Sequence, residues 1–224
     1  MNPTLLLLRF EGVLQSWGIK SRWDIRDTSE APTKSGVIGV FGCALGYKRT
    51  SAVLSGLFDQ LKIGVRVENT GKVVMDYHTV KGNLWTAEEK QRKDHTIVSK
   101  RFYLQDASFL VIVEGEQELI ESIGKALQNP KWPIYLGRKS CVPTRPVYEE
   151  ITNAYGSMEE AFKIIPWSWF GKETSPEGKP LRLQCFIEND EGVSIRRDNA
   201  PMFPSRMFRD RRESAFFVDL PAEG

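Results

Sequence analysis

The chain has 224 residues, of which 41% are hydrophobic and 27% are charged, and its formal net charge at pH 7 is +2. This composition is ordinary for a soluble protein with a hydrophobic core, and no run approaches the roughly 18 apolar residues of a membrane span. The small net charge excludes a molecule whose overall field attracts polyanions, so any such affinity must come from local clusters of Lys and Arg.

The cysteines and the first residues indicate the cellular compartment. Cys43, Cys141 and Cys185 are far apart and form no C-x-x-C pair, which fits a reducing cytoplasm and gives no zinc-site spacing. The apolar run Leu5–Leu8 is too short for a signal peptide, and Arg9 follows it directly. We expect a cytoplasmic protein with no membrane contact, no cofactor and no metal.

The first predicted elements are a buried strand and a helix. Thr4–Phe10 is leucine-rich and precedes a turn, as a central strand does. The next helix begins after Thr33, which is suited to cap it, and runs to Leu45, with Gly46 as the stop signal.

A second helix is predicted over Ser51–Lys62, because its apolar residues recur on one face. That face comprises Val53, Leu54, Leu57, Phe58 and Leu61. Alternation over Ile63–Val67 predicts a half-buried strand, and the following Asn69-Thr70-Gly71 predicts a hairpin that pairs it with Lys72–Asp76.

The remaining elements complete an α+β pattern. Ser108–Glu114 reads as a strand and Gln117–Leu127 as a helix, which gives the order of a ferredoxin-like (RRM-like) unit. Residues 81–101 are polar, charged and without sustained periodicity, and we interpret them as an inserted, projecting arm. We therefore predict a core over residues 1–146 and a small β-rich part over residues 147–224, where Pro and Gly break up the chain.

Positive charge is concentrated in three segments. Residues 131–145 contain four cations and no acid, residues 196–212 contain six arginines against two aspartates, and residues 81–101 contain six cations against three acids. Aromatic residues lie among or beside them, and such segments can hold phosphates and stack on unpaired bases. The alternative is that each is an ordinary solvated surface.

The glycine-rich helix has two readings. Gly36, Gly39 and Gly42 recur every three residues and form one stripe, which allows close packing. Lys34 and Ser35 stand at the helix N-terminus, where free N–H groups favour a phosphate. The segment is not a P-loop, because Lys34-Ser35 precede the glycine instead of following it.

Catalytic residues are scarce. The chain contains two histidines, His78 and His95, and metal-independent RNA cleavage normally needs a general base and a general acid. Tyr77, His78 and Lys81 form a nominal catalytic trio, against the simpler reading that His78 is structural or binds RNA. We find no nucleophile-elbow or zinc-protease motif, and we predict no catalytic residue.

Several segments, in order, resemble the CasD family, which holds the 5′ handle of the guide RNA in type I-E CRISPR Cascade complexes and belongs to the RAMP superfamily. The matching segments are Gly12–Gly18, Pro32–Gly39, Asp76–Val80, Asp106–Phe109, Tyr135–Cys141 and Pro204–Arg206.

This resemblance implies a ferredoxin-like RAMP core, an arm that pins the guide, and a β-rich C-terminal part. It also implies partners: a CRISPR RNA, a CasC-type backbone subunit, a CasA-type large subunit and, indirectly, target DNA. The expected function is therefore that of a non-catalytic subunit of an antiviral surveillance complex, which holds the RNA and caps the filament of backbone subunits.

Two alternatives remain open. One is a metal-independent CRISPR repeat endoribonuclease of the type I-C kind, and the other is a scaffold that binds only proteins.

The RNA-binding residues that we expect are drawn from the basic clusters and from the matching segments, since phosphates and splayed bases are the usual targets in single-stranded RNA. They are Gln15, Ser16, Trp17, Lys34, Ser35, Tyr77, His78, Lys81, Arg101, Arg138, Lys139, Ser140, Arg145, Ser205, Arg206 and Arg209. For Trp17 a second reading, as a lid on the core, is equally open.

Overall fold

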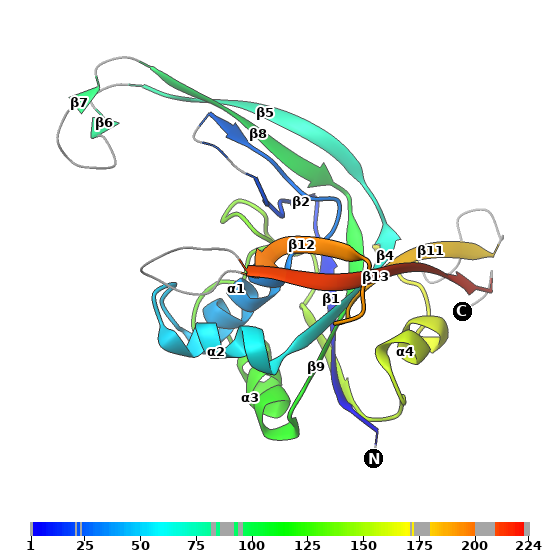
Figure 1. Cartoon of the computed structure of the whole chain (residues 1–224). Helices are drawn as coiled ribbons and strands as arrows, with labels where there is room; N and C mark the ends of the chain where they lie inside the picture. The colour runs from blue at the N-terminus through cyan, green and yellow to red at the C-terminus, as the bar shows by residue number, and fades with distance from the viewer. Residues whose placement is uncertain are drawn as a thin grey trace.

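The structure is a computed structural model that describes residues 2–20, 22, 24–81, 84–85, 92–93, 96–170, 172, 180–199 and 209–221. A seven-stranded sheet runs through the molecule in the order β10-β1-β9-β4-β11-β13-β12 (Figure 1). Its strands are β1 (Thr4–Glu11), β4 (Lys62–Asn69), β9 (Ser108–Gly115), β10 (Tyr148–Thr152), β11 (Leu181–Glu188), β12 (Ser194–Asn199) and β13 (Arg209–Leu220). All neighbouring strands are antiparallel.

Strand β1 is buried on both faces, as the leucine run predicts. Leu6, Leu8 and Phe10 belong to one core cluster, whereas Leu5 and Leu7 belong to the second. This division follows the two-residue period of a strand, which sends alternate side chains to opposite faces. The sheet therefore separates two hydrophobic cores.

Helices cover both faces of this sheet (Figure 1). Helices α1 (Lys34–Leu45), α2 (Ala52–Gln60) and α3 (Gln117–Gln128) pack on the first core, and the short α4 (Met158–Ile164) packs on the second. The predicted ends of α1 are confirmed: Thr33 caps it by accepting from the Gly36 N–H, and Gly46 ends it in the left-handed conformation, φ 75°. On α2 the prediction is wrong for Val53, which is 47% exposed.

The connections explain the strand order. Helices α1 and α2 link β1 to β4, and α3 links β9 to β10. In each case the two linked strands are antiparallel to a third strand that lies between them. The α+β class expected from the sequence is confirmed.

The predicted hairpin after β4 is wrong. Strand β5 (Lys72–Val80) pairs along its length with β8 (Ile97–Gln105) in a second sheet. Both edges of β4 are already occupied, by β9 and by β11. The turn at residues 69–71 therefore leads the chain out of the first sheet instead of folding it back.

Strands β5 and β8 form the arm (Figure 1), which projects from the body and ends in the short pair β6 (Leu84–Trp85) and β7 (Arg92–Lys93). At its base β2 (Leu14–Gln15) and β3 (Ile25–Arg26) also pair with β8. The arm thus begins at β5 and ends with β8, so it is longer than the predicted residues 81–101. Its described part is regular strand.

The C-terminal strands continue the sheet of the N-terminal half. Strand β11 pairs with β4, β13 pairs with β11, and β10 pairs with β1. The sheet therefore runs across the expected boundary between residues 146 and 147, and the described C-terminal strands belong to it.

Candidate nucleic-acid interface

The central strands of the large sheet are covered on both faces. On the α4 side, residues 165–170 form a strap across the strands. Arg66 donates to the carbonyls of Phe162 and Ile165, at 2.5 and 2.7 Å, and Arg9 donates to that of Pro166 at 3.2 Å. Arg66 is also paired with the buried Glu68 at 2.6 Å. The central strands therefore offer no open face on which RNA bases could stack, as they do in RRM domains, and the arm and its base are the stronger candidates.

The first matching segment, Gly12–Gly18, is called here the first motif, and it forms the floor of the arm base, where β2 and β3 pair with β8. Gln15 donates to the carbonyls of Phe10 and Ala107, at 3.1 and 2.7 Å. Trp17 stacks on Phe10 with ring centroids 5.5 Å apart, and its Nε1 donates to Gln15 Oε1. Ser16 donates to the carbonyl of Phe102 on β8.

Gln15 and Trp17 are 0% and 1% exposed. The expectation that they contact RNA bases is therefore wrong for this structure, and the reading of Trp17 as a lid on the core holds. Ser16 is buried as well, and its hydroxyl ties the loop after β2 to the arm. These residues support the surface above them and do not form it.

Lys34 is another correction. Its side chain is 1% exposed, and its Nζ lies 2.6 Å from Glu188 Oε1. Burial lowers the pKa of the ammonium, and the Glu188 carboxylate acts in the opposite direction. Lys34 cannot reach a phosphate without breaking this pair.

The N-terminus of α1 is also filled by the chain itself. The Lys34 N–H donates to Asp198 Oδ2 at 2.9 Å, in the place where the sequence suggested a phosphate. Arg211 holds the same carboxylate through Nε and Nη2, at 2.6 and 2.9 Å. Ser35 is half-buried, and its hydroxyl lies 3.3 Å from that of Thr33.

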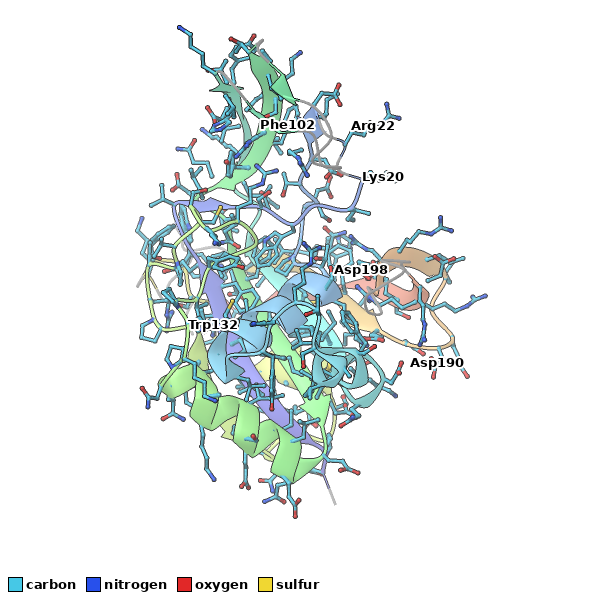
Figure 2. The ribbon with its side chains drawn as sticks, turned by 90° about the vertical axis from the view of Figure 1, so that its left-hand side faces the viewer. Lys20, Arg22, Phe102, Trp132, Asp190 and Asp198 are labelled. Atoms are coloured by element: carbon cyan, nitrogen blue, oxygen red, sulfur yellow. The ribbon has the colours of Figure 1, made fainter. Side chains whose placement is uncertain are left out.

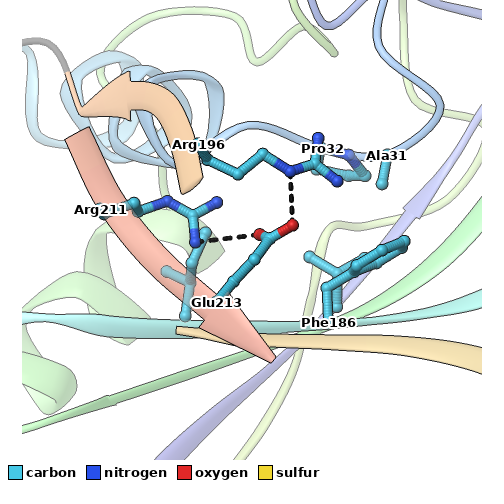
Figure 3. A pocket seen from close by; sticks show the side chains of 8 residues that line it. Ala31, Pro32, Phe186, Arg196, Arg211 and Glu213 are labelled. Carbon is cyan, nitrogen blue, oxygen red and sulfur yellow. Dashed lines mark hydrogen bonds and ion pairs between the residues drawn. The ribbon is translucent and has the colours of Figure 1, made fainter. Parts of the chain in front are cut away.

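Several arginines of the basic C-terminal segment form ion pairs within the chain. Figure 3 shows Glu213 between Arg196 and Arg211, at 2.5 and 3.2 Å. The pocket that these residues line measures only about 10 Å³, which is room for one water molecule and not for a ligand.

Two further arginines of this segment are paired on the surface, Arg197 with Asp210 at 2.9 Å and Arg209 with Asp59 at 3.6 Å. Arg209 keeps an exposed side chain. Ser205 and Arg206 lie outside the described residues.

The segment Tyr135–Cys141 is a loop held against the first motif. Leu136 and Cys141 are buried, and the Leu136 carbonyl accepts from the Ser16 N–H at 3.1 Å. Gly137 has a φ of +92°, and a Cβ at this position would overlap the Ser16 carbonyl. Only glycine allows this close approach. The loop leaves Lys139 and Ser140 exposed beside the arm base, whereas Arg138 is half-buried.

The arm has two different faces. Directly opposed residues of antiparallel strands share a face, so Val73, Met75 and Tyr77 lie with Phe102 and Lys100. Val73, Met75 and Tyr77 are 62%, 52% and 60% exposed, which is unusual for large apolar side chains.

The second face of the arm is polar and contains Asp76, His78 and Arg101. His78 Nδ1 lies 3.8 Å from Asp76 Oδ2, and Arg101 Nε donates to Ser99 Oγ at 3.3 Å. Tyr77 and His78 are consecutive in β5 and point to opposite faces. The structure thus does not assemble Tyr77, His78 and the exposed Lys81 into one catalytic site.

The loop before β3 adds cations that sequence reasoning missed. Lys20 and Arg22 are exposed beside the arm (Figure 2), because β3 pairs with β8 at Lys100 and Arg101. Lys139 is also exposed, in the loop that Arg138 ties to the end of β3. Lys20 and Arg22 follow the segment Gly12–Gly18 closely in the sequence, and this proximity could have identified them as candidates.

Arg145 has different neighbours. It donates to Ser168 Oγ at 3.3 Å and lies 3.9 Å from Glu149. These groups line a cleft of about 820 Å³ between β1, β10 and the strap, which also contains Glu11 and Glu150. The carboxylates make this cleft a poor site for RNA, so Arg145 stands apart from the arm-base cations.

The described residues contain no group of three or more His, Cys, Asp or Glu side chains that could hold a metal ion. No described helix is both long and apolar enough to cross a membrane.

Comparison with known proteins identifies relatives of the chain. The family model for "CRISPR-associated protein (Cas_Cas5)" matches residues 5–217. The "CRISPR system Cascade subunit CasD" of Escherichia coli (strain K12) is 36% identical over 160 residues, which make up 64% of this chain and 69% of CasD. The resemblance seen in the sequence is confirmed.

Two solved structures are similar over nearly the whole chain. One, named "CRISPR RNA-guided surveillance complex", has a TM-score of 0.79 and 30% identity, and the match covers 97% of this chain and 91% of the other. A second, named "Crystal structure of Cas protein", has a TM-score of 0.71 and 36% identity, and the match covers 98% of each chain.

Proposed function

The chain belongs to the CRISPR-associated Cas5 family, and on this premise we propose that it is a non-catalytic, RNA-holding subunit of a Cascade-type antiviral surveillance complex. In this proposal it binds the 5′ handle of the CRISPR RNA and caps the filament of CasC-type backbone subunits. A CasA-type large subunit completes the assembly, and contact with target DNA is indirect.

The observation that carries the proposal is the convergence of four matching segments at the arm base. Residues 12–18, 32–39, 106–109 and 135–141 meet there, although they are spread over more than half of the sequence, and residues 76–80 lie further out on the arm. Lys20, Arg22 and Lys100 are exposed on and beside β3 and β8, and Lys139 is exposed in the loop that Arg138 ties to the end of β3. Phosphates of a single strand are the ligand that such exposed cations favour.

The arm gives each of its faces a role in this proposal. The polar face, with His78 and Arg101, and the adjoining Lys81, Lys139 and Ser140 contact the RNA. The apolar face, with Met75 and Tyr77, contacts a base or a neighbouring subunit, since an exposed apolar stripe of this kind marks an interaction surface. We also propose that β1, β4, β9 and β10 form a ferredoxin-like RAMP core, because their order is that of a split β-α-β unit.

A salt-dependent binding measurement tests the proposal. The RNA probe is the CRISPR repeat of the source organism, compared with a scrambled RNA of equal length. A triple variant, Lys20→Ala/Arg22→Ala/Lys139→Ala, removes three cations from the arm base. The control Lys62→Ala/Lys125→Ala/Lys163→Ala removes three exposed cations from the body.

We expect the arm-base variant to bind at least about tenfold more weakly than the parent protein. Its plot of log affinity against log salt should be shallower by about 2, because each lost phosphate contact in a single strand contributes about 0.7. The control should bind like the parent. Equal losses in both variants, or no preference for the repeat RNA, would count against the proposal.

The endoribonuclease alternative has its own test. Purified protein is incubated with repeat RNA in EDTA, and the products are separated by size. We expect uncut RNA, because Tyr77 and His78 point to opposite faces of β5. Specific cleavage that disappears in His78→Ala would replace the non-catalytic assignment.

A further inference from the structure

Arg138 connects three segments at the arm base. Its Nη2 donates to the carbonyls of Arg26, the last residue of β3, and Asp27, at 2.9 and 3.2 Å. Its guanidinium carbon lies 4.5 Å from the centre of the Tyr103 ring on β8. One side chain thus links the loop 135–141, the end of β3 and the base of the arm.

These contacts leave little of Arg138 for an RNA phosphate. Both protons of Nη2 have a carbonyl acceptor, and one side of the planar group faces Tyr103. Its Nη1 is buried and has no hydrogen-bond partner. A phosphate ligand needs accessible donors, and the neighbouring Lys139, which is exposed, provides them.

The linked segments determine how the arm leaves the body. Tyr103 precedes Leu104, which is buried in the core, and it is paired with Val74 of β5. On the other edge of β8, β3 pairs at Lys100 and Arg101. Arg138 therefore clamps β8 to the body from outside the sheet, at the point where buried strand becomes projecting arm.

Only an arginine meets these demands. The guanidinium is planar, so it can face an aromatic ring while its edge donates to two acceptors. A lysine keeps the charge but has a single ammonium and no planar face. Replacing Arg138 by lysine therefore distinguishes a residue that positions the arm from one that only supplies a positive charge.

We propose that Arg138 is a positioning residue, which fixes the arm against the body in the orientation that binds RNA, and that the adjacent Lys139 supplies the phosphate contact. The inference rests on the proposed function for its RNA-binding part. Its structural part, the clamping of the arm, stands independently of any RNA.

Three variants of the full chain test the proposal: Arg138→Lys, Arg138→Ala and Lys139→Ala. Hydrogen–deuterium exchange of β5 and β8 measures the arm without RNA. Affinity for repeat RNA at several salt concentrations measures binding. Thermal unfolding verifies that each variant is folded, and Tyr103→Leu serves as a second route to the same clamp if Arg138→Ala does not fold.

We expect Arg138→Lys and Arg138→Ala to exchange faster than the parent in β5 and β8, by at least about fivefold, and to bind RNA about tenfold more weakly with an unchanged salt slope. Lys139→Ala should leave exchange unchanged and reduce the slope by about 0.7, the value for one phosphate contact.

Parent-like exchange in both Arg138 variants, or parent-like affinity in Arg138→Lys, would overturn the proposal. If the parent protein binds no RNA, the proposed function fails, whereas the exchange result still decides the clamp.

Discussion

The backbone N–H of Lys34 donates to the carboxylate of Asp198, 164 residues later in the chain, at 2.9 Å. Asp198 lies on β12 and is 1% exposed. Its carboxylate satisfies an N–H of the first turn of α1, in addition to the cap that Thr33 provides. Helix N-termini attract negative groups because their first N–H groups are unpaired. Here the chain supplies that group itself, and Arg211 holds it in place.

Asp198→Ala should destabilise the protein strongly. The change leaves the guanidinium of Arg211 and the first turn of α1 without their buried partner. Removing one member of a buried ion pair typically lowers the free energy of unfolding by about 3–5 kcal/mol. Chemical denaturation monitored by circular dichroism measures this. Asp210→Ala, which breaks the exposed pair with Arg197, is the control and should have little effect; similar losses in both variants would contradict the buried-cap interpretation.

Two glycines of α1 should respond in opposite directions to alanine. A Cβ on Gly36 would lie 2.7 Å from Trp17 Cε3, whereas a Cβ on Gly39 would meet nothing within 4 Å. Gly36→Ala should therefore lower the free energy of unfolding by about 1–3 kcal/mol through overpacking. Gly39→Ala should raise it by about 0.5–1 kcal/mol, because alanine is the better helix former. Urea titrations compare them, and the prediction is lost if both variants change in the same direction.

The apolar face of the arm should matter for assembly more than for stability. The double variant Met75→Ser/Tyr77→Ser changes two side chains that are 52% and 60% exposed. The free energy of unfolding should therefore change by less than about 0.5 kcal/mol per site. Recovery of the Cascade complex after co-expression with the source organism's other subunits should fall about tenfold. The control Val193→Ser changes a residue outside the arm that is 94% exposed, and this variant should assemble normally. An equal loss of complex with Val193→Ser would contradict a specific role of the arm in assembly.

Cys185 should resist alkylation in the folded protein. Burial raises the pKa of its thiol to about 12, so almost no thiolate is present at pH 8. Iodoacetamide labelling read by mass spectrometry should modify it only after unfolding, and Cys43, which is partly exposed, should react before it. The unfolded thiol titrates near 8.5, so the stability linked to this group is present below that pH and is lost as the pH rises toward 12. Rapid native labelling of Cys185 would contradict this.

Local patterns predicted the elements well where neighbouring residues decide them. The leucine run of β1 and the Thr33 and Gly46 ends of α1 were predictable, because strand burial and helix capping depend on nearby residues. The hairpin after β4 was not predictable, because β9 and β11 pair with its edges from 39–52 and 119–123 residues away. A sequence window does not contain those strands.

For the candidate site, sequence patterns predict segments but not which side chains are accessible. The matching segments 12–18, 32–39, 106–109 and 135–141 do meet, yet Gln15, Trp17 and Lys34 are internal, and Arg138 is half-buried. A basic or aromatic side chain has the same identity whether it is buried or exposed, so its environment decides its role. For Lys34 the deciding partner, Glu188, is 154 residues away.

The pairing of β4 with β11, whose residues lie far apart in the sequence, also has a consequence for biosynthesis. A ribosome adds roughly 5–20 residues per second, so the newly made α1 waits about 10–30 s for Asp198, the acceptor of its Lys34 N–H. During that interval Lys34 has no counterion, and one edge of β4 is open to other strands. Translation that stops before β11 should therefore yield an aggregation-prone fragment, and holdase chaperones should bind the nascent polypeptide until that strand emerges.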